Sequence, residues 1–261
     1  MAATADSLDL HGQVILITGG CGDLGLPIVS AFLAHGASVI VNDILSPDDA
    51  AARLPDDRAL SYVPGAVADA SQATALLESA AQRFGMTPTT VCCHAGLVGA
   101  HPIEAFPIDE FDAIIATNLR GSFLLAQAAA SKWKSEGTPG HIVFTSSWVA
   151  NTPWPGIAPY SASKAALNSL TRSFARELAP AGIRANALAP GIVDAGMARH
   201  QWDTDADYRQ RAERAIPLGH LQDTSSVANA MLFLVSPLAS YMTGSVLTVD
   251  GGCSLYPMDP E

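Results

Sequence analysis

Short apolar and β-branched runs alternate with longer helical patterns along the whole chain, and this alternation limits the possible folds more than any other feature. The runs predict strands at residues 13–18, 38–42, 60–63, 90–93, 141–146, 184–188 and 246–249. The segments between them predict helices at residues 24–35, 71–84, 109–135, 159–178 and 225–235. Strands that alternate with helices form a parallel sheet with helices on both faces. We therefore expect an α/β fold, a single doubly wound parallel sheet (Rossmann-like), in one domain over residues 1–261.

Charge and cysteine spacing narrow the class of partner. The formal net charge is −11, and phosphate-rich partners need clustered Lys and Arg, so we expect neither nucleic acid nor a membrane surface as a partner. No apolar stretch approaches the roughly 20 residues of a membrane span, and residues 1–9 lack the basic and apolar parts of a signal peptide. Four cysteines without regular spacing are typical of reduced thiols. The expectation is a cytoplasmic protein that binds a small molecule.

A glycine-rich turn follows the first predicted strand and opens the first predicted helix. Its sequence is Thr18-Gly19-Gly20-Cys21-Gly22-Asp23-Leu24-Gly25. Gly20, Gly22 and Gly25 have the G-x-G-x-x-G spacing of dinucleotide-binding turns. The missing side chains let a pyrophosphate approach the backbone, and the helix N-terminus offers free N–H groups. The pattern alone also fits an ordinary tight turn, but its place between strand and helix favours a dinucleotide site.

An aspartate, Asp43, ends the second predicted strand, 18 residues after Gly25. A carboxylate there can accept hydrogen bonds from the ribose hydroxyls and would repel a 2′-phosphate. No Lys or Arg lies near the turn or directly after Asp43 in the sequence. The alternative interpretation is a solvated turn aspartate. The sequence favours NAD over NADP as the cofactor.

Three side chains suited to proton transfer follow the fifth predicted strand. Ser147 comes directly after it, and Tyr160 and Lys164 stand four residues apart on one face of the next helix. A nearby ammonium lowers the pKa of a tyrosine, so Tyr160 could act as a general acid and base nearer neutral pH. Ser147 can hold a substrate oxygen by a hydrogen bond. A Tyr–Lys pair of this spacing is often structural, but downstream of a nucleotide turn it predicts chemistry at a hydroxyl or carbonyl group.

These motifs together resemble the short-chain dehydrogenase/reductase family over about residues 10–252, including Val249-Asp250-Gly251-Gly252, which matches the family's terminal strand. The resemblance implies Asn118, Ser147, Tyr160 and Lys164 as catalytic residues, with Asn118 holding a water that relays protons. It also implies a homotetramer or dimer built partly on the helices of Asn118 and Tyr160, and we expect the homotetramer. The implied cofactor contacts are Gly19, Gly22, Asp23, Leu24, Asp43, Val67, Ala95, Gly96, Tyr160, Lys164, Pro190, Gly191 and Val193.

Several positions depart from the family pattern. Asp23 stands where the family has its middle glycine; a carboxylate there can approach the pyrophosphate or cap the helix, and we expect a cap that points aside. His94 replaces an asparagine whose hydrogen bonds tie neighbouring strands, so other bonds must replace them. Ala66 replaces an aspartate that touches adenine, which leaves that contact to the backbone at Val67. Ala195 replaces a threonine that binds the carboxamide.

The run Cys92-Cys93-His94 contains metal-ligating residue types. Successive strand side chains point to opposite faces of the sheet, so both thiols cannot easily reach one ion. No second cluster in the sequence supplies the remaining ligands. We expect no metal and buried structural thiols, although Cys21 could be an accessible thiol near the cofactor.

Loops beyond the carboxyl ends of the strands supply the candidate substrate contacts. These contacts are His101, Ser147, Asn151, Trp154, Met197 and Trp202. Polar side chains beside aromatic rings suit a sugar, sugar acid or polyol. The same His and Trp side chains are as often surface or lid-packing residues. Residues 192–216 are expected to form a lid that moves.

The sequence thus predicts an NAD-dependent oxidoreductase that transfers a hydride between the nicotinamide and a hydroxyl or carbonyl carbon of a small polar substrate. Tyr160 would take the hydroxyl proton, Ser147 would hold the oxygen, and Asn118 with Lys164 would complete the relay. One alternative is a 3-oxoacyl or other carbonyl reductase. An alternative of another class is a non-catalytic NAD-sensing scaffold on the same fold, which the intact set of four residues argues against.

Overall fold

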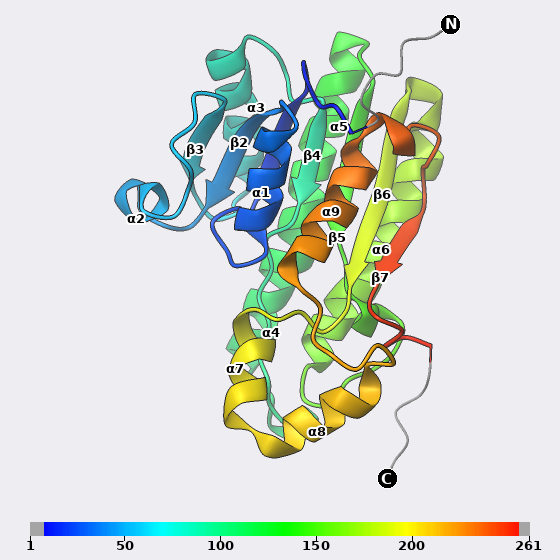
Figure 1. The fold of residues 1–261 in the computed structure, drawn as a ribbon. Coiled ribbons are helices and arrows are strands. Elements are labelled where there is room, and N and C mark those ends of the chain that lie inside the picture. The colour runs from blue at the N-terminus through cyan, green and yellow to red at the C-terminus, as the bar shows by residue number, and fades with distance from the viewer. Residues whose placement is uncertain (1–7, 256–261) are drawn as a thin grey trace, which may run out of the picture.

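The computed structural model describes residues 8–255; residues 1–7 and 256–261 of the predicted domain lie outside the described residues. Its centre is one parallel sheet in the order β3-β2-β1-β4-β5-β6-β7 (Figure 1). The strands are β1 (Val14–Thr18), β2 (Ser38–Asp43), β3 (Leu60–Pro64), β4 (Thr90–Cys93), β5 (Gly140–Thr145), β6 (Ile183–Pro190) and β7 (Val246–Val249). Each lies within two residues of its predicted bounds, so the predicted strands are confirmed.

The described helices cover both faces of the sheet, which confirms the predicted fold class. They are α1 (Gly25–Ala34), α2 (Pro47–Ala51), α3 (Ala70–Phe84), α4 (Ile108–Ile114), α5 (Ser122–Glu136), α6 (Ala158–Leu178), α7 (Gly196–Thr204), α8 (Ala206–Ala215) and α9 (Thr224–Val235). No helix within residues 8–255 combines the length and the apolar character that crossing a membrane requires.

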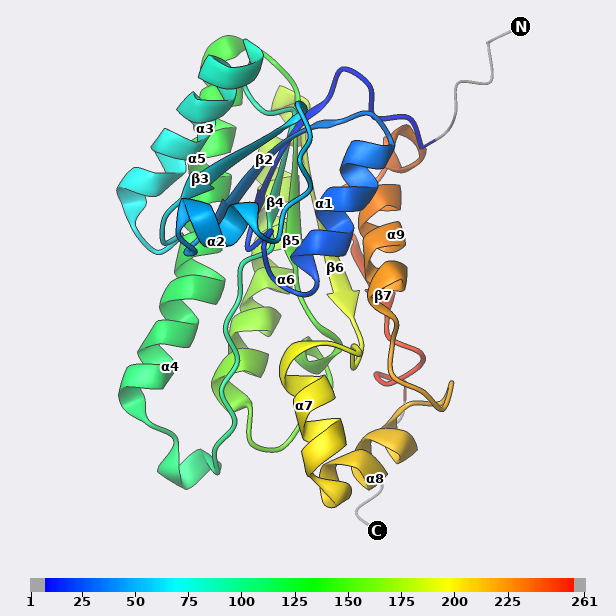
Figure 2. The ribbon, with the colours of Figure 1, turned by 60° about the vertical axis from the view of Figure 1, so that its left-hand side comes forward.

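Two apolar cores explain this arrangement. α1 and α9 pack on one face of the sheet, where Phe32 and Met231 are buried, and α3, α5 and α6 pack on the other, around Trp133 and Leu167 (Figures 1 and 2). β1, β4 and β5 are buried along their whole length. Parallel strands covered on both sides have this continuous apolar character. The continuous apolar runs are the reason why the strands can be predicted from the sequence.

The helix predicted for residues 109–135 is interrupted. A π-helical segment, η2 (Ile115–Gly121), joins α4 to α5 and carries Asn118. π-helical turns are rare and occur frequently at functional sites. The spacing of apolar residues predicts one continuous helix here. A single π-helical turn changes that spacing too little to be recognised in the sequence.

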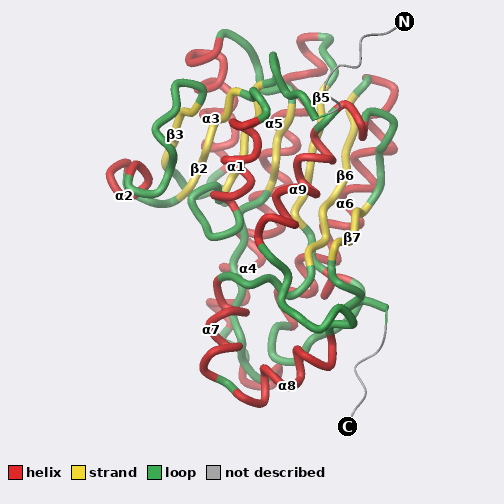
Figure 3. The backbone as a smooth tube through the Cα atoms, viewed as in Figure 1, coloured by secondary structure: helices red, strands yellow, loops and turns green. Residues whose placement is uncertain are grey.

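The predicted lid, residues 192–216, contains the two helices α7 and α8, which the sequence did not predict. Figure 3 shows both beyond the carboxyl ends of the strands. None of the residues of α7 is buried, whereas α8 buries Tyr208 and Ala212. The two helices of the lid therefore differ in how firmly they are packed.

Candidate active site

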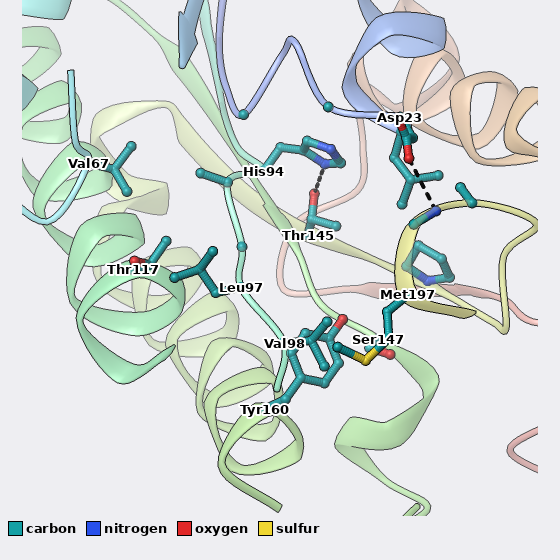
Figure 4. A pocket seen from close by; sticks show the side chains of 18 of the residues that line it. Asp23, Val67, His94, Leu97, Val98, Thr117, Thr145, Ser147, Tyr160 and Met197 are labelled. Atoms are coloured by element: carbon teal, nitrogen blue, oxygen red, sulfur yellow. Dashed lines mark hydrogen bonds between the residues drawn. The ribbon is translucent and has the colours of Figure 1, made fainter. Parts of the chain in front are cut away.

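A cavity of about 520 Å³ lies beyond the carboxyl ends of β1, β2, β4, β5 and β6, where doubly wound sheets bind their ligands. Its size is typical of a ligand site. Figure 4 shows Asp23, Val67, Ser147 and Tyr160 around this cavity. The predicted cofactor contacts and three of the predicted catalytic residues all line it: Gly19, Gly22, Asp23, Leu24, Asp43, Val67, Ala95, Gly96, Ser147, Tyr160, Lys164, Pro190, Gly191 and Val193.

The glycine-rich turn after β1 has no space for side chains at its tightest points. A Cβ on Gly25 would lie 2.3 Å from the carbonyl oxygen of Gly19, and a Cβ on Gly19 would lie 2.8 Å from the Cα of Ala95. No side chain caps the N-terminus of α1. An uncapped helix N-terminus above a glycine turn is suited to a pyrophosphate, so these residues fit a dinucleotide cofactor.

The expectation that Asp23 caps α1 is wrong. Leu24 is the N-cap residue, and its side chain makes no capping bond. The Oδ2 atom of Asp23 instead accepts a hydrogen bond of 3.2 Å from the backbone N–H of Gly196, the first residue of α7 (Figure 4). The start of α7 therefore lies within hydrogen-bonding distance of Asp23, although the two are distant in the sequence.

Asp43 lies at the end of β2 and holds the glycine-rich turn. Its carboxylate accepts hydrogen bonds from Cys21 N (3.0 Å) and Ile44 N (2.8 Å). A carboxylate has about four acceptor sites, so it can still accept from ribose hydroxyls. The expectation that no Arg lies near the turn needs correction, because Arg53 Nη1 donates to the carbonyl oxygen of Cys21 at 2.9 Å. Arg53 follows α2, a helix that the sequence did not predict.

The four cysteines are buried, as expected. Cys92 and Cys93 belong to the cores on opposite faces of the sheet. Cys21 is buried too, and this burial raises its pKa to about 11, so the accessible thiol considered at this position is not observed. Within residues 8–255, no group of three or more His, Cys, Asp or Glu side chains is placed to hold a metal ion.

His94 ties three strands together at the floor of the cavity. Its Nδ1 atom lies 3.0 Å from Thr145 Oγ1 at the end of β5, and its backbone N–H donates to Thr18 Oγ1 at the end of β1 (3.1 Å). These bonds replace those of the asparagine that the family pattern has here. Burial, with a smaller contribution from the charge of Lys164, lowers the pKa of His94 to about 4, so the imidazole is neutral at physiological pH.

Ser147 and Lys164 are held in place from the buried side. Ser147 follows β5 and is the N-cap of the short helix η3 (Trp148–Ala150), where its Oγ accepts from Val149 N. Lys164, one turn after Tyr160 on α6, is 3% exposed, and its Nζ donates to the carbonyl oxygen of Thr145 at 2.7 Å. Burial lowers the pKa of Lys164 to about 8.

The acidity of Tyr160 differs from the sequence-based expectation. The Lys164 Nζ atom lies 5.4 Å from the centroid of the Tyr160 ring, but its hydrogen bond goes to Thr145. Burial raises the pKa of Tyr160 above its ordinary value, and a hydrogen bond with Ser147 opposes this rise. In this arrangement the desolvation of the phenol outweighs any lowering by the lysine.

Asn118 lies behind the cavity wall rather than on it. Its Oδ1 accepts from Leu97 N (2.7 Å), and its Nδ2 donates to Leu97 O (2.9 Å) and to Ser163 Oγ (3.1 Å). It therefore fastens the segment after β4 to α6. Gly96 lies between Asn118 and Lys164, because a Cβ on Gly96 would lie 3.4 Å from Lys164 Nζ and 3.5 Å from Asn118 Oδ1.

Four of the predicted substrate contacts do not line the cavity. His101 bonds to Glu110 on α4 at 2.7 Å, and Asn151 is exposed after η3. Trp154 and Trp202 pack in an apolar cluster with Trp148 and Tyr208. For His101, Trp154 and Trp202, packing or bonding with other side chains, which the sequence does not reveal, keeps them off the cavity wall.

Met197 does line the cavity, as predicted, and the apolar side chains of Leu97 and Val98 line it as well. Figure 4 shows Val98 and Met197 at the same end of the cavity as Ser147 and Tyr160. Leu97 and Val98 directly follow the Ala95-Gly96 segment, and this position is the signal that could have identified them.

Known proteins resemble this chain over nearly its whole length. A family described as enoyl-(acyl carrier protein) reductase matches residues 22–254. The 3beta-hydroxysteroid dehydrogenase 1 of Eggerthella lenta is 36% identical over 256 residues, which are 95% of this chain and 96% of that protein.

Solved structures have the same fold. A gluconate 5-dehydrogenase from Burkholderia cenocepacia in complex with NADP and tartrate has a TM-score of 0.88 at 29% identity, with 96% of this chain and 98% of that chain covered. A 3-ketoacyl-(acyl-carrier-protein) reductase from Brucella melitensis complexed with NADH has a TM-score of 0.82 at 31% identity, with 94% and 100% covered. These relatives differ in substrate and in cofactor.

Proposed function

Since the chain belongs to the short-chain dehydrogenase/reductase family of oxidoreductases, we propose that it catalyses the reversible NAD-dependent oxidation of a secondary hydroxyl group on a largely apolar, ring-shaped substrate such as a hydroxysteroid. The observation that carries this proposal is the shared cavity. Ser147, Tyr160 and Lys164 line the same hollow as the glycine-rich turn and Asp43. The residues suited to proton transfer and the residues suited to bind a dinucleotide therefore line the same cavity.

Each residue has a defined task in the proposed reaction. The Tyr160 hydroxyl group exchanges a proton with the substrate oxygen, and Ser147 Oγ holds that oxygen. The nicotinamide, when bound, supplies a hydride acceptor or donor. Lys164, whose Nζ lies 5.4 Å from the centroid of the Tyr160 ring, would take part in the proton route, because its lowered pKa of about 8 lets it lose and regain a proton near neutral pH. Asn118 positions the wall of this route through Leu97 and Ser163.

The preference for NAD rests on Asp43. Its carboxylate is the acidic group at the end of β2 on the cavity wall, and it would repel a 2′-phosphate. Arg53, beside the turn, opposes this preference because a guanidinium attracts phosphate. We propose that Asp43 dominates, because it lines the cavity and Arg53 reaches only the outer carbonyl group of Cys21.

The apolar substrate class rests on the end of the cavity near Tyr160. The side chains that the loops add there are Val98 and Met197, and Leu97 lines the cavity next to Thr117; all three favour hydrocarbon over hydroxyl groups. The polar side chains expected for a sugar, among them His101 and Asn151, lie elsewhere. The hydroxysteroid dehydrogenase among the relatives supports the same class. A sugar acid is the second candidate, because the gluconate 5-dehydrogenase structure shares the fold at 29% identity.

A substrate panel tests the proposal. The purified protein is supplied with NAD or NADP and with 3α- and 3β-hydroxysteroids, gluconate, polyols or 3-hydroxyacyl thioesters, and reduced nicotinamide is measured. We expect a hydroxysteroid to exceed every polyol about 100-fold in kcat/KM, because burial of its apolar rings contributes several kcal/mol. NAD should exceed NADP about tenfold, and Asp43→Ser should remove that preference.

The other outcomes discriminate between the alternatives. A higher kcat/KM for gluconate or a polyol would overturn the apolar substrate class, and a higher kcat/KM for 3-hydroxyacyl thioesters would identify an acyl reductase. If NAD bound and no substrate on the panel reduced it, while Tyr160→Phe bound NAD as the wild type does, a non-catalytic NAD-sensing scaffold would be favoured.

We also propose that the chain forms a homotetramer. Exposed large apolar side chains on α4 and α5, Ile108, Phe111 and Phe123, support an interface on these helices, since apolar surface exposed to water favours burial against a partner. Light scattering measures the mass in solution, and a monomer would overturn this assignment.

A further inference from the structure

A single hydrogen bond joins two walls of the cavity that lie far apart in the sequence. Asp23, at the end of the glycine-rich turn, accepts it from the backbone N–H of Gly196, 173 residues later. Both residues line the cavity, and Figure 4 shows the bond crossing from the turn to the loop of the lid. Ala198 and Trp202 hold the rest of α7, because they pack partly buried against the apolar cluster of Trp148 and Tyr208. Asp23 is the group that fastens the start of α7, beside the cavity.

The chain just before Gly196 is held by backbone hydrogen bonds, whereas the helix that begins at Gly196 buries no side chain. Asp194 N donates to Gln222 O, and Val193 pairs with Gln222 in a parallel bridge. From Gly196 onward, α7 buries none of its residues until α8 begins. Gly196 itself has a φ of +52°, a conformation that glycine adopts without strain. Gly196 is therefore placed as a hinge, and Asp23 is the group that holds it.

The position of Asp23 is unfavourable for a dinucleotide. α1 and α7 both begin beside it, and neither has a side-chain cap, so both N-termini favour a negative charge. Asp23 supplies that charge from within the protein. A diphosphate bound at the glycine-rich turn would share the same positive ends and would be repelled by the carboxylate.

We propose that Asp23 acts on both the lid and the cofactor: its carboxylate fastens α7 to the glycine-rich turn by accepting from Gly196 N, and its charge weakens the binding of the cofactor diphosphate beside it. The inference rests on the proposed function in one respect, the dinucleotide nature of the cofactor.

Two substitutions separate the charge from the hydrogen bond. Asp23→Asn keeps an oxygen that can accept from Gly196 N and removes the charge, whereas Asp23→Ala removes both. Asp203→Asn is the matched control, since it removes the same charge from the exposed side of α7, where the Asp203 carboxylate pairs with Arg199. The dissociation constant for NAD is measured by calorimetry without substrate, and amide hydrogen exchange of residues 196–204 is measured without cofactor.

We expect Asp23→Asn and Asp23→Ala to bind NAD about fivefold more tightly than the wild type, a gain that shrinks at high salt because exposed charges are screened. Exchange of residues 196–204 should rise in Asp23→Ala and stay at the wild-type rate in Asp23→Asn and Asp203→Asn. Unchanged or weaker NAD binding in both Asp23 variants would overturn the role in affinity, and unchanged exchange in Asp23→Ala would overturn the fastening of the lid. If the wild type did not bind NAD at all, the proposed function would fail, while the exchange measurement would still test the fastening.

Discussion

The cavity has two walls that are built in opposite ways. The wall formed by the end of β5 and the start of α6 carries Ser147 and Lys164, both buried, with the Lys164 ammonium bonded to the backbone of β5. The opposite wall, α7, contributes Met197 and buries no side chain. The first wall is part of the core. The second is attached through its ends, through Asp23, and through the partly buried side chains of Ala198 and Trp202.

This difference corresponds to a division of labour. Proton transfer requires donor and acceptor to be held in a fixed geometry, which a buried wall provides. Entry of a substrate requires a segment that opens at low cost in free energy, and segments with few buried contacts open locally most easily. The comparison predicts that changes in the first wall affect chemistry, whereas changes in α7 leave folding almost unaffected.

The largest expected effect is that of Tyr160→Phe, which removes only the phenolic hydroxyl group from the fixed wall. Loss of a general acid and base lowers kcat about 10²- to 10⁴-fold, and we expect the dissociation constant of NAD to change less than about threefold. Steady-state kinetics with the preferred substrate of the panel and calorimetry with NAD measure the two quantities. A kcat within tenfold of the wild-type value would remove Tyr160 from the mechanism.

The two helices of the lid differ in how much they bury, since α8 buries Tyr208 and α7 buries no residue. Trp154→Ala tests this difference. Trp154 packs edge-on against Trp148 and against Tyr208 of α8. Truncating a buried tryptophan costs about 3 to 5 kcal/mol, so the free energy of unfolding should fall by about that amount. Trp202→Ala on α7, where the indole is only half-buried, should cost clearly less. Equal losses in urea denaturation would contradict the division between α7 and α8.

The same division explains what could be predicted from the sequence. The strands and the residues at their ends were predicted because buried parallel strands have continuous apolar runs, and the chain direction places their ends at one edge. The prediction that Ser147, Tyr160 and Asp43 are site residues depends only on such local patterns. They line the cavity as expected.

The features that the sequence did not reveal depend on contacts between distant residues. His101 is paired with Glu110, and Trp154 is packed against α8, so neither reaches the cavity. Arg53, which follows α2, bonds to the carbonyl oxygen of Cys21 in the turn, and Asp23 bonds to Gly196 instead of capping α1. No local spacing encodes these pairings, since each is decided by how the lid and the outer helices pack.

Lys164→Met tests whether the fixed wall lowers stability for the sake of function. Below pH 8 the buried lysine is charged in the folded protein although its pKa has fallen from 10.5 to about 8, and this charge costs up to about 3 kcal/mol. Its bond to Thr145 recovers about 1 kcal/mol. We expect the variant to be about 2 kcal/mol more stable at pH 7 in urea denaturation, and to be almost inactive.

The pH dependence supplies the control for Lys164→Met. Between about pH 8 and 10.5 the unfolded chain holds a proton on Lys164 that the folded protein has lost, so the stability of the wild type rises with pH across this window. The variant lacks this contribution, and its advantage should therefore disappear toward pH 10.5. A variant that is less stable at pH 7, or an advantage that does not change with pH, would show that desolvation of the ammonium is not the dominant cost.

Arg199→Ala should have the smallest effect, and it defines the other end of the comparison. Arg199 on α7 pairs with Asp194 and Asp203, and the side chains of all three are nearly half-exposed. Exposed ion pairs contribute little to stability, so we expect the melting temperature to change by less than about 1 °C, measured by circular dichroism at low and at high salt. The kcat should stay close to the wild-type value, because the guanidinium does not line the cavity. A large fall in melting temperature would mean that surface ion pairs hold α7 in place. The two walls would then differ in the type of interaction that holds them, and not in how strongly they are held.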